Sequence, residues 1–291
     1  MTKYGIFQMN RIRITILFLT AFSLYSCKIR DTANQHNDHS FNKVPKIKII
    51  SNDWGTGNQE DIHAVLKSVS EIIFPLGGQA SYNPIMVGRS ENGPIVLYRR
   101  GPNEQYIINL NTQDRYWCQY AFQFSHEIGH ILCGYKDGDS SNLWFEETLA
   151  EVASLFVLRR LEEKWQNSPP YPEWEQYAPE FTKYAENRIQ LYKDEIPNDL
   201  NQWIDHNAEE LKTNPTNRKR NVSVAIRLLP VFENFNDAWA ACMYLNKKKS
   251  KKEISFQEYI RDWYHACTHI SQKKVVEIIA SKLNIKLPKG K

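Results

Sequence analysis

The stretch SHEIGHILCGYKDGDSSNLWFEETLAE, residues 125–151, places two histidines four residues apart and then, after a polar loop, several carboxylates close together. The residues before and within it, RYWCQYAFQFSHEIGHIL (115–132), contain no proline, and Gly134 beyond them is a natural C-terminal stop, so the sequence predicts a helix over 116–133. Beyond the loop, Asn142 suits the N-cap of a second helix that runs through LWFEETLAEVASLFVLRRLEEKW. These two helices form the expected centre of the fold.

The histidines of this stretch have the spacing of metal ligands. On a helix, His126 and His130 lie on one face, so both imidazoles can reach a single ion. Glu127 follows the first histidine, as in H-E-x-x-H, and can take a proton from a metal-activated water without being a ligand itself. The pattern predicts a catalytic zinc (Zn²⁺) site with Glu127 as the general base.

A catalytic zinc ion needs a third protein ligand. Glu147 and Glu151 share one face of the second helix, whereas Glu146 is expected to point elsewhere. We therefore predict Glu147 as the third ligand, and Glu151 as the acceptor of the second ring N–H of a ligand histidine. Asp137 and Asp139, in the intervening loop, remain open as alternative third ligands.

The motif HEIGH followed by WFEETLAE resembles the gluzincin metallopeptidases, the clan of thermolysin and the aminopeptidase N type. The resemblance is close over 125–151 and loose over 46–166. It implies that His126, His130 and Glu147 hold zinc and that Glu127 is the general base. The aminopeptidase motif G-x-M-E-N is missing from the chain, so the resemblance favours an endopeptidase acting on peptide or protein substrates.

The residues before the motif predict one helix among four strands. The strand signals are KIKIIS (46–51), PIMVG (84–88), PIVLY (94–98) and YIINLN (106–111), and an apolar face marks a helix over 58–77. SENG (90–93) predicts a hairpin between the second and third strands. The resemblance implies a mixed sheet whose edge strand binds substrate backbone, and YIINLN is the expected edge.

After the Pro-rich stretch 167–180 the sequence shows helical patterns only, around 180–193, 199–212, 217–229, 234–248, 255–267 and 271–283. The expected fold class is therefore α+β, with a zincin-like core at 46–166 and an all-helical C-terminal subdomain at 167–291. His206, His265, His269 and several tyrosines are candidate oxyanion donors within the helical part, where the resemblance implies that the donor lies. The run KKKSKK (247–252) is expected to be a solvated loop, with contact to anionic lipid as the alternative.

The N-terminus is typical of an export signal. Basic residues up to Arg13 precede an apolar run, 14–26, that is too short for a permanent membrane span, and Cys27 follows. The ending LYSC resembles a bacterial lipobox, which implies a lipoprotein signal peptide at 1–27, a lipid on Cys27 and a flexible tether at 28–45. Lys28 then implies an anchor at the periplasmic face, outer membrane or cell surface. The alternative is an ordinary signal peptide with an incidental cysteine.

Charge argues against a nucleic-acid partner. Lys3, Arg11 and Arg13 account for three of the 37 basic residues, so the chain after Cys27 carries 34 basic and 33 acidic residues. A nearly neutral body lacks the basic excess that binds phosphate backbones.

The four cysteines after Cys27 leave their redox state open. Cys118 and Cys133 would lie about 22 Å apart along one helix and cannot form a disulfide. A bridge between Cys242 and Cys267 and a set of free buried thiols are both compatible with the sequence.

Two classes of function follow from these patterns, and a third interpretation is that the histidine pattern is accidental and binds no zinc. The first is a membrane-tethered, exported zinc peptidase. The second is a catalytically inert surface lipoprotein that keeps the zincin fold to bind a partner. Glu127 favours the first class, because a purely structural metal site needs no base at that position.

Overall fold

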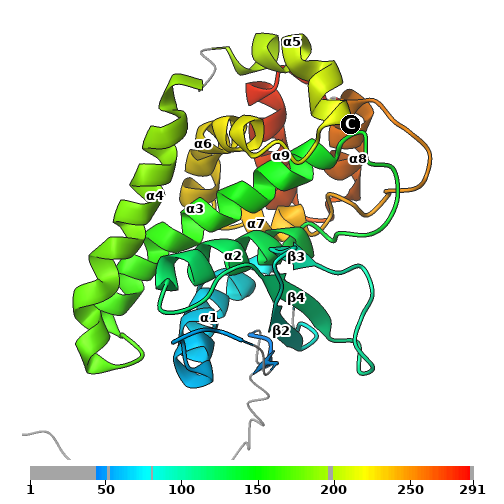
Figure 1. The fold of residues 1–291 in the computed structure, drawn as a ribbon. Coiled ribbons are helices and arrows are strands. Elements are labelled where there is room, and N and C mark those ends of the chain that lie inside the picture. The colour runs from blue at the N-terminus through cyan, green and yellow to red at the C-terminus, as the bar shows by residue number, and fades with distance from the viewer. Residues whose placement is uncertain (1–43, 51–52, 80, 196–198, 289–291) are drawn as a thin grey trace, which may run out of the picture. The chain divides into compact units, whose positions relative to one another are not determined.

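The computed structural model describes residues 44–50, 53–79, 81–195 and 199–288 (Figure 1). The expected signal at 1–27, the expected lipid on Cys27 and the tether up to residue 43 lie outside the described residues. The described residues belong to one compact unit. Within these ranges, no helix combines the length and apolar character that a membrane crossing requires.

A small mixed sheet forms the first part of the described chain, which confirms the α+β class. Its order is β1-β2-β4-β3, with β1, β2 and β4 parallel and β3 antiparallel to β4. The strands are β1 (Ile47–Ile49), β2 (Ile85–Arg89), β3 (Ile95–Val96) and β4 (Tyr106–Leu110). One helix, α1 (Gln59–Ile73), lies between β1 and β2 in the chain, as the sequence predicts.

Two expectations about the sheet are wrong. β2 and β3 do not form a hairpin, because β4 lies between them and pairs with β2 over five residues. YIINLN is therefore an interior strand, and the edge strands are β1 and β3. The pairing of β2 with β4 places four buried apolar residues on one face of the sheet, whereas the two-residue β3 contributes only Val96. The longer pair buries more apolar surface and so takes the interior position.

Helix α1 begins and ends with clear local signals. The side chain of Asn58 accepts a hydrogen bond from the backbone N–H of Asp61 at 2.7 Å, which caps the first turn. Val65, Leu66 and Val69 are buried along one face. The chain then tightens into the short helix η1 (Phe74–Gly77), which ends at Gly78 with φ of 76°.

The motif helix α2 (Trp117–Leu132) is nearly all buried and contacts the sheet through β3 and β4. It ends in a Schellman arrangement: Gly134 has φ of 62°, its N–H donates to the carbonyl of Ile131, and the N–H of Tyr135 donates to the carbonyl of His130. This stop places Tyr135 beside the sheet, where its hydroxyl donates to the Leu97 carbonyl at 2.8 Å.

Helix α3 (Leu143–Asn167) packs beside α2 and is surrounded on most sides by other helices (Figure 1). Asn142 occupies the N-cap position, as predicted, but its side chain does not cap the helix. Its backbone, with φ −111° and ψ 12°, is outside the extended region that a capping residue adopts. The amide instead donates to the Ile254 carbonyl at 2.9 Å and ties the start of α3 to the chain ahead of α8.

The remaining elements are helical, as predicted. They are η2 (Pro172–Tyr177), α4 (Ala178–Tyr192), η3 (Lys193–Glu195), α5 (Leu200–Thr213), α6 (Arg218–Asn234), α7 (Ala238–Cys242), α8 (Phe256–Ala266) and α9 (Ile270–Lys282). The helix expected over 234–248 is shorter than predicted, since α7 gives way to turns at 243–248. Helix α3 packs against α4 and α6, so the Pro-rich stretch turns the chain without separating two packed bodies.

The four described cysteines are buried free thiols. Of the two alternatives left by the sequence, this is the one observed, and Cys242 and Cys267 are not bridged. Cys118 lies 3.3 Å from the hydroxyl of Tyr177 and thereby links α2 to the Pro-rich turn.

Helices α2 and α3 approach each other closely at Gly129, within the motif itself. A Cβ atom at this position would lie 2.7 Å from the Cα of Ala150 and 3.2 Å from the Cβ of Ala153. Nearby, the hydroxyl of Ser154 donates to the Phe122 carbonyl at 2.9 Å. Small residues on both helices therefore allow the approach that brings the histidines to the carboxylates.

Substitution of Gly129 with Ala is expected to destabilise the protein by about 1–3 kcal/mol, because the added methyl group meets backbone that cannot rotate away. Pushing α3 outward should also weaken metal binding. Thermal unfolding of the metal-free protein measures the first effect and a zinc titration the second. An unchanged melting temperature would show that the two helices separate without strain.

Candidate metal centre

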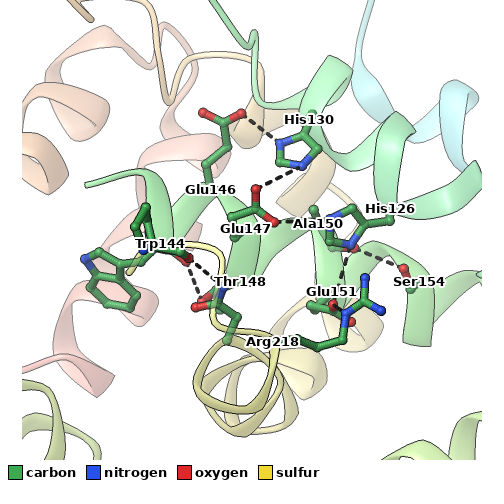
Figure 2. A network of polar contacts seen from close by, with 12 residues as sticks. His126, His130, Trp144, Glu146, Glu147, Thr148, Ala150, Glu151, Ser154 and Arg218 are labelled. Atoms are coloured by element: carbon green, nitrogen blue, oxygen red, sulfur yellow. Dashed lines mark hydrogen bonds and ion pairs between the residues drawn. The ribbon is translucent and has the colours of Figure 1, made fainter. Parts of the chain in front are cut away.

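Three side chains from α2 and α3 converge on one point. One ligand atom each from His126, His130 and Glu147 lies within 4.8 Å of the others, a group able to hold a metal ion. The Nε2 atom of His126 is 3.2 Å from Glu147 Oε2, and the Nε2 atom of His130 is 3.7 Å from Glu147 Oε1 (Figure 2). Two imidazoles and one carboxylate are the donor set of many catalytic zinc sites.

Opposite charges hold these groups together in the metal-free protein. Burial disfavours the imidazolium form of His130, but the carboxylates of Glu147 and Glu146 outweigh burial and raise the pKa of His130 to about 10. Burial alone would raise the pKa of Glu147, yet the charges of His130 and His126 lower it to about 2. Two imidazoles beside an ionised carboxylate therefore form a group that favours a cation.

The raised histidine pKa predicts that metal binding depends on pH. Zinc requires a neutral imidazole, so it must displace the proton that His130 holds up to about pH 10. We expect at least about one proton to be released per zinc at neutral pH, and an apparent affinity that rises about tenfold per unit between roughly pH 6 and 8. Calorimetry in buffers of different ionisation enthalpy counts these protons. A pH-independent affinity would contradict the charged cluster.

Glu127 lies beside this group and lines the same cavity. Its side chain is buried, and burial raises the pKa of its carboxyl group while the nearby charges of His126 and His130 oppose that rise. The backbone N–H of Val96, in the edge strand β3, donates a hydrogen bond to its carboxylate. The acid is thus fixed between the histidine pair and the sheet edge.

Glu146 has a role at this centre that the sequence analysis missed. Its Oε1 atom accepts from Nδ1 of His130 at 2.8 Å, and the residue is 2% exposed, so the expectation that it points elsewhere is wrong. Helices α2 and α3 run in opposite directions, so His130, late in α2, lies opposite the first turn of α3. The connection between the two helices, residues 133–142, is longer than the loops that characteristically join antiparallel neighbours, so the sequence held no clear signal for this contact.

Glu151 lies near His126, but not as closely as expected. Its Oε1 atom is 3.7 Å from His126 Nδ1, which is too long for a hydrogen bond, and it accepts from Nε of Arg218 at 2.9 Å (Figure 2). The Nδ1 atom of His126 and the Oε2 atom of Glu151 are buried and have no hydrogen-bond partner among the described residues. Arg218, in the first turn of α6, was not predicted from sequence.

The other sequence candidates lie away from this group. The carboxylate of Asp139 hydrogen-bonds to Ser141, and neither Asp137 nor Asp139 belongs to the three-residue group or lines its cavity. None of the three proposed oxyanion donors, His206, His265 and His269, lines that cavity either. The proposed donors sit on α5, at the end of α8 and at the start of α9.

The centre opens into a cavity of about 380 Å³. One wall is the edge segment 94–98, in which Ile95 and Tyr98 are 43% and 55% exposed. Tyr98 stacks on Tyr135 with the ring centroids 5.6 Å apart. The opposite wall includes Asn221 and Arg218, which is the one Lys or Arg among the described lining residues. The sheet edge therefore presents exposed apolar and aromatic side chains along this wall of the cavity.

Comparisons of this chain with models of protein families, with curated proteins and with solved structures found no match.

Proposed function

We propose that this chain is a zinc-dependent peptidase of the gluzincin type that cleaves internal peptide bonds. The observation that carries the proposal is the position of Glu127, a buried acid beside three converging donor side chains in an open cavity. A metal site with a structural role alone has no use for such an acid.

The residues of the site would have separate roles in hydrolysis. His126, His130 and Glu147 would hold the zinc ion, which when bound polarises a scissile carbonyl and acidifies a water molecule. Glu127 would accept the proton of the attacking water and return it to the leaving amine. The burial that raises the pKa of Glu127 makes it a stronger base than an exposed glutamate.

Substrate would bind as an added strand along β3. Leu97 donates its N–H to Ile107 in β4, so the backbone groups of Val96 face the opposite way, toward the cavity. The Val96 N–H is taken by Glu127, which leaves its carbonyl to pair with a peptide N–H. Ile95 and Tyr98 would contact substrate side chains, and Arg218 would face the negative charge that develops on the carbonyl oxygen.

The proposal places the enzyme outside the cytoplasm, with Cys27 carrying the lipid that anchors it to the periplasmic face, the outer membrane or the cell surface. Incorporation of a fatty-acid analogue in the wild type and its loss in Cys27→Ala would test the anchor.

Protein purified without chelators tests the activity. We expect about one zinc per chain, cleavage of a peptide library with apolar or aromatic residues enriched at the cut sites, loss of cleavage with a chelator and recovery with zinc. A zinc-loaded wild type that cleaves nothing in a broad library would favour the second function, an inert zincin-fold lipoprotein that binds a partner.

A further inference from the structure

The basic run 247–252 has one lysine that does not face solvent. The side chain of Lys249 is 7% exposed, whereas that of its neighbour Lys248 is 51% exposed and pairs with Asp262 at 2.8 Å. The Nζ atom of Lys249 lies 3.7 Å from Oε2 of Glu146. One member of an apparently solvated run therefore reaches the back of the metal centre.

Asn246, the residue before the run, contacts the same Glu146 oxygen. Its amide donates to Glu146 Oε2 at 2.7 Å and to the Cys133 carbonyl, at the end of α2, at 3.1 Å. Its own oxygen accepts from the Tyr259 hydroxyl at 2.8 Å. Both the nitrogen and the oxygen of the buried Asn246 amide are therefore hydrogen-bonded. The amide cannot flip without losing these bonds.

Close packing between two loops holds the run in this place. The backbone N–H of Asp139 donates to the Ser250 carbonyl at 2.7 Å. A Cβ atom at Gly138 would lie 2.8 Å from that same carbonyl oxygen and 3.1 Å from the Cγ atom of Lys249. The loop after the motif helix therefore leaves no room for Lys249 to swing outward on that side.

From these contacts we propose that Lys249 and Asn246 are positioning residues of the metal centre. They neutralise and orient the Glu146 carboxylate, which in turn fixes His130 with Nε2 turned toward Glu147. A buried carboxylate is costly unless it is paired and hydrogen-bonded, and here the helical part of the chain provides both partners. The inference rests on the proposed metal site but does not require peptidase activity.

The proposal gives Lys248 and Lys249 different roles, although the sequence makes them equivalent. Lys249→Met should weaken zinc binding by about 10- to 100-fold, the usual cost of disturbing a partner of a metal-ligating histidine. Lys248→Met, the same change one residue earlier, should stay within about twofold of the wild type. Competition with a fluorescent chelator measures both affinities, and circular dichroism confirms that both variants are folded.

A double-mutant cycle separates positioning from general support of the fold. In a Glu146→Gln background the charge that Lys249 neutralises is gone, so Lys249→Met should cause no further loss of zinc affinity. A second loss as large as the first would mean that Lys249 acts on the fold and would overturn the proposal. If Lys249→Met does not fold, Asn246→Asp, which keeps the shape but replaces the donor with a charge, should cause a comparable loss.

The outcomes distinguish this inference from the function proposed above. A wild type that binds no zinc refutes the peptidase and the inference together. A wild type that binds zinc, with Lys249→Met and Lys248→Met equal in affinity, refutes the inference alone.

Discussion

Replacing Glu127 with Gln is expected to lower peptide cleavage by about 10³- to 10⁴-fold, at the upper end of what a general base contributes. Glutamine keeps the shape of the side chain and an oxygen that can accept from the Val96 N–H. It cannot take up a proton from water. Since Glu127 is not a ligand in this proposal, zinc content should remain at about one per chain.

Glu163→Gln on α3 is the matched control for this change. The side chain of Glu163 is 70% exposed and, within the part of the chain that the structure describes, pairs with Arg160 alone at 3.5 Å, so its loss should leave both cleavage and zinc content unchanged. Steady-state kinetics and metal analysis on the three proteins form the comparison. Robust cleavage by the Glu127→Gln protein would reject Glu127 as the base.

Replacing Glu147 with Gln should produce the largest loss of metal, at least about 100-fold in zinc affinity. Loss of an indirect partner already costs about 10- to 100-fold, and an amide is a much poorer zinc ligand than a carboxylate. Cleavage should fall together with zinc occupancy. In the wild type without metal, attraction to the histidines lowers the pKa of Glu147 to about 2, and the variant lacks this attraction. At neutral pH the metal-free variant should therefore have a lower free energy of unfolding than the metal-free wild type.

Asp137→Asn and Asp139→Asn are the controls, because the sequence left these residues open as third ligands. Asp139 hydrogen-bonds to Ser141, and neither residue belongs to the donor group, so both variants should retain zinc. Zinc retained by Glu147→Gln and lost in either aspartate variant would reassign the third ligand. Equilibrium dialysis against a chelator gives all four affinities under one condition.

The local patterns of the sequence predicted much of the centre. The spacing of His126 and His130 places both imidazoles on one helix face whatever the rest of the chain does, because that periodicity belongs to the helix. Glu147 could be predicted because a second helix had to follow the polar loop. These predictions depend on few residues and on short distances along the chain.

The outer partners of the histidines were predicted poorly. Glu146 was expected to point elsewhere, because the face that a helix residue presents depends on where the neighbouring helix lies. Lys249 looked like the other lysines of its run, and only packing against the loop at Gly138 separates it from them. Strand order failed for the same reason, since β2 and β4 are distant in the chain and pair through burial.

The sequence by itself determined the motif helix, the helix after it, the α+β class and the chemistry of the donor side chains, since each follows from periodicity within about one or two helical turns. Tertiary structure decided which carboxylate meets which histidine, which strand is the edge, and which cation lies behind each acid. Those choices depend on contacts between residues as far apart as Glu146 and Lys249. Burial and charge pairing select such contacts, and no spacing along the chain encodes them.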